Sequence, residues 1–135
     1  MTYAIVNSMH GYEGPSGTDP VFYRRMQIKR SNERAVFIDE GRLSPNSWGI
    51  WYDQERWWDQ ATARHGDGTN FSFADGHSEY WKWKDPLTIE IAKMDYNYWQ
   101  GTGRFDLSLS STLGNQDLYR VQKAVWGKLG YTPSQ

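Results

Sequence analysis

The segment 69–84, TNFSFADGHSEYWKWK, constrains the fold of this chain more than any other part of the sequence. Two runs in which apolar and polar residues alternate are separated by the dipeptide Asp75-Gly76. Alternation with a period of two is typical of a β-strand that has one buried face. Asp-Gly suits a type I′ turn, because both central residues of that turn need positive φ angles. The sequence therefore predicts an antiparallel β-hairpin over 69–84.

A two-residue turn also predicts which side chains of the hairpin share a face. With the Asp-Gly dipeptide as the turn, Phe71 pairs with Tyr80 across the two strands. Alternate side chains point to opposite faces of a sheet, so Trp81 and Trp83 would lie on the face opposite Phe71, among polar residues. We expect that face to be available for contacts unless a helix covers it.

The other segments predict one α+β domain over residues 1–135, an antiparallel β-sheet with long loops and a C-terminal helix. Gly, Pro and Ser are concentrated in the loops, where turns are expected. The expected elements are strands at 3–7 and 35–41, an extended segment at 21–30, a turn at 31–34, helices at 85–95 and 115–130, and loops at 10–20, 44–60 and 101–114.

Both expected helices have signals at their ends. Asp85 and Pro86 suit the N-cap and the first helical position of one helix. In the other, apolar residues recur near the 3.6-residue period from Leu118 to Leu129. Gly130 is placed to end that helix.

Tryptophan is the exceptional component of the composition. The chain holds 8 Trp among 135 residues, although hydrophobic residues make up only 38%. A small core cannot easily enclose so many indoles, and exposed aromatic residues often form a contact surface. Packing in the core is the alternative for each of them. The candidate carbohydrate-binding residues are Trp48, Trp51, Trp57 and Trp58 of the 44–60 loop, and Trp81 and Trp83 of the hairpin.

The charge balance disfavours nucleic acid and anionic lipid as partners. The formal net charge is −1, which leaves no overall basic footprint. No apolar run reaches the ~18 residues of a membrane span, so we predict no membrane segment in this sequence. A local basic cluster is interpreted as a solvated strand face. It consists of Arg24, Arg25, Lys29, Arg30 and Arg34.

His65 and Asp75 could suggest a catalytic or metal-binding pair, but strand geometry separates them. Residues 69–75 in a strand cover about 20 Å at about 3.3 Å per residue. The chain from 69 back to 65 spans at most about 14 Å. We therefore expect a structural role, in which His65 pins the open end of the hairpin, with Asp85 as its candidate partner.

No catalytic motif stands out, and we predict that the chain is not an enzyme. It has no Cys, no serine in a nucleophile elbow and no glycine-rich phosphate loop before a helix. Paired carboxylates could support glycoside hydrolysis, but their spacing singles out none of them. We predict no cofactor and no metal, with calcium at loop oxygens as the open alternative. The acidic residues concerned are Asp39, Glu40, Asp53 and Glu55 for hydrolysis, and Asp67 and Asp106 for calcium.

The sequence RHGDGTNFSFADGH resembles the H-X9-DG signature, in which nine residues separate a histidine, here His65, from Asp75-Gly76. That signature marks a group of prepilin-like proteins, the type II secretion pseudopilins and their relatives. The segment IKRSNERAVFIDEG, 28–41, is similar to the strand that precedes the signature in them. The resemblance covers residues 1–85 well and the C-terminal helix loosely. The methylated hydrophobic N-terminal helix of such proteins has no counterpart in this sequence.

The resemblance implies an exported, non-enzymatic subunit with a pilin-like head domain, extracellular or periplasmic and associated with the cell surface. Two functions remain open. In one, exposed tryptophans stack on the sugar rings of a polysaccharide while nearby polar groups bind its hydroxyls. In the other, the chain is a purely structural pilin or pseudopilin subunit, and its aromatic residues pack against the N-terminal helix or other pseudopilin subunits.

Overall fold

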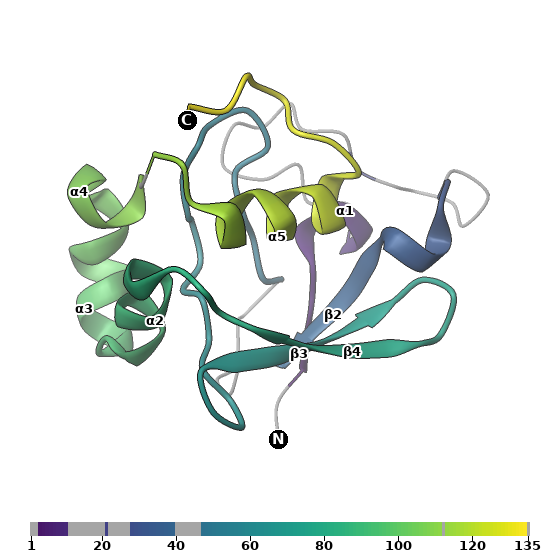
Figure 1. Ribbon diagram of the computed structural model, residues 1–135, viewed down its shortest axis with the longest axis horizontal. Coiled ribbons are helices and arrows are strands. Elements are labelled where there is room, and N and C mark those ends of the chain that lie inside the picture. Colours follow the sequence, from purple (N-terminus) through teal and green to yellow (C-terminus); the bar gives the residue numbers. More distant parts are fainter. Residues whose placement is uncertain (1–2, 11–20, 22–27, 40–46, 112, 135) are drawn as a thin grey trace.

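The computed structural model describes residues 3–10, 21, 28–39, 47–111 and 113–134. They form an α+β fold in which helix α5 lies across one face of a four-stranded antiparallel sheet (Figure 1). The elements are β1 (Tyr3–Ile5), α1 (Asn7–His10), η2 (Ser31–Glu33), β2 (Ala35–Asp39), β3 (Gly68–Phe73), β4 (Ser78–Lys82), α2 (Pro86–Lys93), α3 (Tyr96–Gly101), η3 (Gly103–Phe105), α4 (Leu107–Ser110) and α5 (Gln116–Trp126).

The sheet is a simple meander in which each strand pairs with the next along the chain, in the order β1-β2-β3-β4. The strands predicted at 3–7, at 35–41 and in the hairpin are therefore confirmed. The extended segment predicted at 21–30 falls mostly outside the described residues, and its described part, residues 21 and 28–30, forms no strand. Arg24 and Arg25 of the basic cluster also lie outside the described residues.

The hairpin forms where it was predicted, but its register differs from the prediction by one residue. Phe71 pairs with Glu79 instead of Tyr80, and Thr69 pairs with Trp81. A one-residue shift moves every side chain of one strand to the other face of the sheet. Trp81 consequently lies on the same face as Phe71, and the predicted division of the two faces is wrong.

The turn explains the shift. Gly76 has a φ of +96°, but Asp75 is not among the described residues with positive φ, so the type I′ turn does not form. The N–H of Gly76 donates to the carbonyl of Phe73 (3.0 Å), and the N–H of Phe73 donates to that of His77 (2.9 Å). The loop thus has three residues, 74–76, with glycine at its left-handed position.

The core contains most of the tryptophans that were expected on the surface. Trp57 and Trp99 are fully buried, and helix α5 contributes Val121 and Val125 to the same core. The expectation that the candidate tryptophans are exposed is wrong for four of the six, whose exposed fractions are 1% for Trp48, 0% for Trp57, 5% for Trp81 and 3% for Trp83.

Buried indoles have a structural role in this protein, because residues 47–67 form no helix or named strand and yet contribute Trp48, Ile50, Trp57 and Ala61 to the core. Backbone carbonyls in such a segment lack ladder partners and must find other donors. Four indole N–H groups donate to carbonyls of residues 50–62. The bonds are Trp48 to Gln60 (3.1 Å), Trp83 to Thr62 (2.7 Å), Trp99 to Trp58 (3.0 Å) and Trp126 to Ile50 (3.2 Å).

A buried amide on α5 serves the same segment. The side-chain nitrogen of Gln122 donates to the carbonyls of Trp51 and Gln54, both at 2.8 Å. The side-chain oxygen of Gln122 accepts the hydroxyl of Tyr131, and burial raises the pKa of that tyrosine. Gln122 therefore fixes α5 to the irregular segment as well as to the C-terminal residues.

The helices α2 and α5 form where they were predicted. In α2 the side chain of Asp85 accepts from the N–H of Leu87 (2.9 Å), as an N-cap does. Helix α5 begins after Asn115 and ends at Gly127, which has a φ of +86°. The predicted end at Gly130 is therefore wrong by three residues.

The loop predicted at 101–114 instead contains the end of α3, the 3-10 helix η3 and the single turn α4. Asp95 caps α3 through the N–H of Tyr98 (3.0 Å), and Asp106 caps α4 through the N–H of Ser108 (3.0 Å). Helices this short cannot show a 3.6-residue apolar period, which is why the sequence pattern did not predict them.

Candidate functional site

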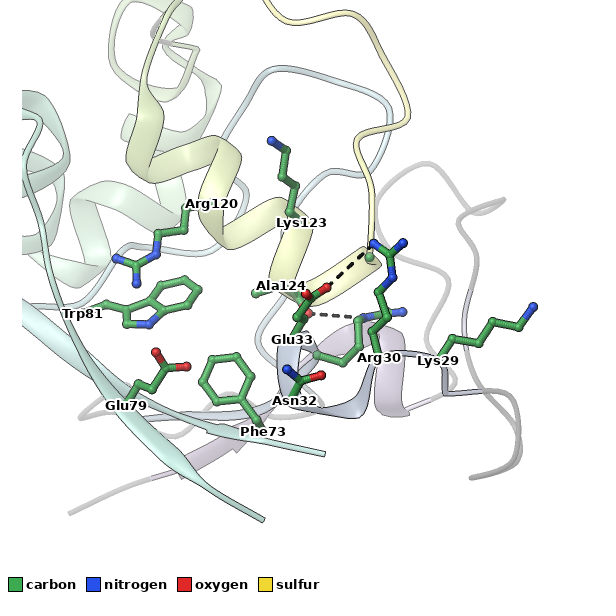
Figure 2. A pocket seen from close by; sticks show the side chains of 12 residues that line it. Lys29, Arg30, Asn32, Glu33, Phe73, Glu79, Trp81, Arg120, Lys123 and Ala124 are labelled. Atoms are coloured by element: carbon green, nitrogen blue, oxygen red, sulfur yellow. Dashed lines mark hydrogen bonds and ion pairs between the residues drawn. The ribbon is translucent and has the colours of Figure 1, made fainter. Parts of the chain in front are cut away.

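A cavity of about 600 Å³ opens between the hairpin, the segment around η2 and helix α5 (Figure 2). Its volume lies within the range of small-molecule binding sites. Three separate parts of the chain supply its wall. The lining residues include Phe73, Glu79 and Trp81 from the hairpin, Arg120, Lys123 and Ala124 from α5, and Lys29, Arg30, Asn32 and Glu33 from the segment around η2.

Local structure explains why these side chains converge. The observed register places Phe73, Glu79 and Trp81 on the face of the sheet that α5 covers. Arg120 and Lys123 are three residues apart on α5, so they lie on the same side of the helix, and both are exposed. The cavity is therefore bounded by a sheet face on one side and by a cationic helix face on the other.

Arg120 lies over the ring of Trp81, with its Cζ atom 3.8 Å from the ring centroid (Figure 2). This is close range for a cation–π interaction, which attracts the guanidinium to the electron-rich face of the indole. Trp81 also contacts Phe73, with ring centroids 5.9 Å apart. The contact between Phe73 and Trp81 therefore supports the guanidinium of Arg120 at the edge of the cavity.

His77 connects the hairpin tip to the cavity wall. One ring nitrogen, Nδ1, pairs with Asp75, and the other, Nε2, lies 3.0 Å from a carboxylate oxygen of Glu79. These hydrogen bonds raise the pKa of His77, and the bonds from His77 lower the pKa of Asp75. The imidazole also stacks on Phe73 at 4.6 Å between ring centroids. The raised pKa favours the protonated form of His77, and this imidazole is the partner of the Glu79 carboxylate.

Arg34 also lines the cavity, and it is buried and not a solvated strand residue, contrary to the interpretation of the basic cluster. Its side chain donates to the carbonyl oxygens of Val125 (2.6 Å) and Ala124 (3.4 Å) at the end of α5. Burial lowers its pKa to about 10. A cation at these last carbonyls of the helix also complements the helix dipole.

The six candidate tryptophans do not form one surface. Of them, Trp81 lines the cavity, whereas Trp51 and Trp58 form a separate, half-buried pair with ring centroids 5.7 Å apart. The guanidinium of Arg104 covers Trp58 at 4.3 Å, and exposed Phe105 meets the same ring edge-on. Burial raises the pKa of Asp59, which pairs with Arg104 at 3.0 Å. Trp51, Trp58 and Arg104 therefore form a second cluster, whose members contact one another and do not line the cavity.

The charged partner of His65 is Asp39 of β2 and not Asp85, the partner that was predicted. Its Nε2 lies 3.6 Å from an oxygen of the fully buried Asp39 carboxylate, and its backbone adopts a left-handed φ of +58°. The hydroxyl of Tyr80 donates to the carbonyl of His65 (3.0 Å), which ties this residue to the base of the hairpin. Asp75 lies in the turn at the opposite end of the hairpin, where it pairs with His77.

The remaining acidic candidates have structural partners or lie apart from the cavity. Glu55 accepts from the N–H of Ser134 (3.0 Å), and Asp67 pairs with Lys93 (3.0 Å). Asp53 is exposed, Asp106 is a helix cap, and Glu40 lies outside the described residues. In the described part of the chain, no three His, Cys, Asp or Glu residues are grouped so that they could hold a metal ion.

Comparison of the chain with models of protein families, with curated proteins and with solved structures gave no match. What is established is the class, an α+β fold with a four-stranded antiparallel meander. The resemblance to pseudopilins stays a prediction. None of the described helices is long and apolar enough to cross a membrane.

The sequence did not single out the cationic side of the cavity. In the sequence pattern, Arg120 and Lys123 belong only to the polar face of an amphipathic helix. A usable signal was present, since Arg120 and Lys123, three residues apart, share one side of the predicted helix. What the sequence could not supply was the hairpin register that places Trp81 beneath that face.

Proposed function

We propose that this domain is a non-catalytic carbohydrate-binding module on a pseudopilin-like scaffold, extracellular or periplasmic and associated with the cell surface. The cavity beside Trp81 would hold the ligand, in place of the six-tryptophan surface expected from the sequence. The observation that supports this most is a cavity of about 600 Å³ in which aromatic side chains lie beside carboxylate, amide and cationic groups.

Sugar recognition needs this combination. The C–H faces of a sugar ring pack on flat apolar or π surfaces, while its hydroxyls need donors and acceptors at fixed positions. Phe73 and Trp81, which are 4% and 5% exposed and pack against His77 and Arg120, form an apolar base of the cavity and leave only a small aromatic area for a sugar. Glu79 and Asn32 provide acceptors and donors from two different elements. Because a meander and a helix hold these groups, little ordering is required when the ligand binds.

A glycan screen tests the proposal. Affinity electrophoresis and calorimetry with neutral and acidic polysaccharides would compare the wild type with the double variant Asn32→Ala/Glu79→Ala. Asn97→Ala/Glu90→Ala is the matched control, since both residues are exposed and neither lines the cavity. We expect binding by the wild type and the control, and at least a tenfold loss in the cavity variant. Absence of binding to every glycan would contradict the function, and undiminished binding by the cavity variant would contradict the site.

A structural subunit is the second candidate, and one observation favours it. Three exposed aromatic side chains lie on strands of the sheet, with exposed fractions of 51% for Tyr3, 40% for Phe37 and 45% for Tyr80. Phe37 pairs with Ser72, which places it on the face opposite the core. Such a face could pack against other pseudopilin subunits. Sedimentation velocity of the wild type and a Phe37→Ser/Tyr80→Ser variant tests it, because only self-association that the variant loses would support this role.

A further inference from the structure

We infer that the cavity beside Trp81 selects acidic glycans, and that Arg120 is the anchor for a sugar carboxylate. This inference rests on the proposed carbohydrate-binding function and narrows it to polysaccharides that contain uronic acids.

The charge of the cavity favours an anionic ligand. Five cationic side chains line it, against the two carboxylates Glu33 and Glu79. Both carboxylates already have partners, since Glu33 lies 3.9 Å from Arg30 and Glu79 lies 3.0 Å from His77. On α5, neither Arg120 nor Lys123 forms an ion pair with any described residue. A bound carboxylate would therefore meet cations that no anionic side chain in the described part of the chain neutralises.

The geometry of Arg120 adds specificity to this charge. A guanidinium presents its N–H groups as a planar fork that matches the two oxygens of a carboxylate, and such paired bonds are stronger than neutral ones. Stacking on Trp81 at 3.8 Å restricts the orientation of that fork before any ligand arrives. A restricted side chain loses less conformational entropy on binding than a free one. The indole thus acts as a support for the cation, and contact between the sugar and the indole face is not required.

Lys123 extends the same cationic surface by one helical turn. It lies three residues after Arg120 on the exposed side of α5, and both side chains border the cavity (Figure 2). Arg34, by contrast, is committed to the carbonyl oxygens at the end of the helix. In Figure 2 the ammonium of Lys123 points away from the guanidinium of Arg120, so the two cations would meet different carboxylates of a polymer and not one isolated anion.

The distribution of charge favours an acidic glycan over nucleic acid. The protein as a whole has a formal net charge of −1, whereas nucleic-acid affinity is dominated by many phosphate contacts along a basic surface. Here the cluster of five cationic side chains is confined to one cavity, whose lining includes Phe73 and Trp81. A polyuronate, which has one charge per sugar and apolar C–H faces between the charges, fits that confinement.

Paired ligands provide the test. Calorimetry would compare oligogalacturonate and oligomannuronate with their methyl esters, which keep the sugar and remove the charge. The variants are Arg120→Gln, Arg120→Lys and the control Lys82→Gln, whose lysine is exposed on β4 away from the cavity. Circular dichroism would verify that each variant is folded. Arg120→Lys keeps the charge and removes the fork, so it remains informative if the glutamine variant does not fold.

We expect at least one acid form to bind at least tenfold tighter than its ester, and the preference to shrink at high salt. Arg120→Gln should abolish the preference, Arg120→Lys should reduce it, and Lys82→Gln should leave it unchanged. Equal binding of acid and ester would overturn the inference but leave the carbohydrate-binding function standing. Failure of every neutral and acidic glycan to bind would instead overturn that function. Tighter binding of a single-stranded oligonucleotide than of any glycan would also overturn the inference.

Discussion

The guanidinium of Arg120 lies 3.8 Å from the ring centroid of Trp81, and this contact joins the C-terminal helix to the hairpin at the edge of the cavity. The contact exists only because the hairpin loop contains three residues, which places Trp81 on the face under α5. A two-residue turn would turn the same indole outward. The candidate site therefore depends on the turn at 74–76.

The turn glycine provides the first prediction. Gly76 has a φ of +96°, and a Cβ atom at this position would have nothing within 4 Å, so the cost of a side chain there comes from the backbone alone. We expect Gly76→Ala to lower the free energy of unfolding by about 1–2 kcal/mol, the cost of a left-handed non-glycine residue. Urea denaturation measures it. Gly101→Ala is the control, since its surroundings are also open and its φ is ordinary. Equal effects of the two substitutions would refute the assigned turn.

The amide of Gln122 provides the second prediction. Gln122→Leu keeps the helix and the approximate volume but leaves the carbonyls of Trp51 and Gln54 without their donor. We expect a loss of about 2–4 kcal/mol in the free energy of unfolding, the cost of buried groups left unsatisfied. Gln116→Leu, an exposed position on the same helix, should change it by less than about 0.5 kcal/mol. If both variants are equally stable, Gln122 does not hold the irregular segment.

Trp57 distinguishes a core role from a ligand-binding role. Its side chain is fully buried, with the ring of Trp83 packed edge-on at 6.2 Å between centroids. We expect Trp57→Ala to lower the free energy of unfolding by about 3–5 kcal/mol through the cavity it creates. Tyr98→Ala, at a side chain that is 47% exposed, is the surface control. A stable Trp57→Ala protein that had lost glycan binding would favour the six-tryptophan surface over the cavity.

The hairpin tip predicts a specific pH dependence. Hydrogen bonds with Asp75 and Glu79 raise the pKa of His77 above its usual value of about 6.5. The contribution of His77 to stability is therefore complete below its unfolded-state pKa and is lost as the pH rises through its folded-state pKa. The pKa of Asp75 is lowered, so its contribution is present above its unfolded-state pKa and is lost as the pH falls through the folded-state value.

An NMR titration of the imidazole protons measures the pKa of His77 and tests its pairing with Asp75. We expect Asp75→Asn to lower the pKa of His77, because the hydrogen bond that contributes most to the increase is weakened when the carboxylate is replaced. Glu90→Gln, an exposed carboxylate on α2, should leave the titration of His77 unchanged. A pKa of His77 that is insensitive to Asp75→Asn would show that the two side chains are not paired in solution.

The elements that the sequence predicted well are those with strong local signals. The structure contains the hairpin at Asp75-Gly76, the two strands β1 and β2 that precede it, and the helix capped by Asp85. The signal at the turn was right in place and wrong in type, because Asp-Gly also suits a three-residue loop with glycine at the left-handed position. The resulting one-residue difference in strand register determines the face of the sheet on which Trp81 lies.

The burial of the tryptophans could not be predicted from composition, because the reason lies in tertiary hydrogen bonding. An irregular segment that packs against the core needs donors for its carbonyls, and four indoles supply them, those of Trp48, Trp83, Trp99 and Trp126. Neither the path of that segment nor the donors that reach it are encoded in a local pattern. A local sequence pattern could not predict the cavity either, because its lining residues come from β3, β4, α5 and the segment around η2.

The most direct measurement is a two-dimensional NMR titration of the isotope-labelled protein with an oligouronate, following the indole N–H signals and the Arg120 guanidinium. We expect the signals of Trp81 and Arg120 to shift together and saturate, while those of Trp48 and Trp57, which do not line the cavity, stay in place. Shifts confined to Trp51 and Trp58, or no shift with any glycan, would contradict the claim that the cavity beside Trp81 binds carbohydrate.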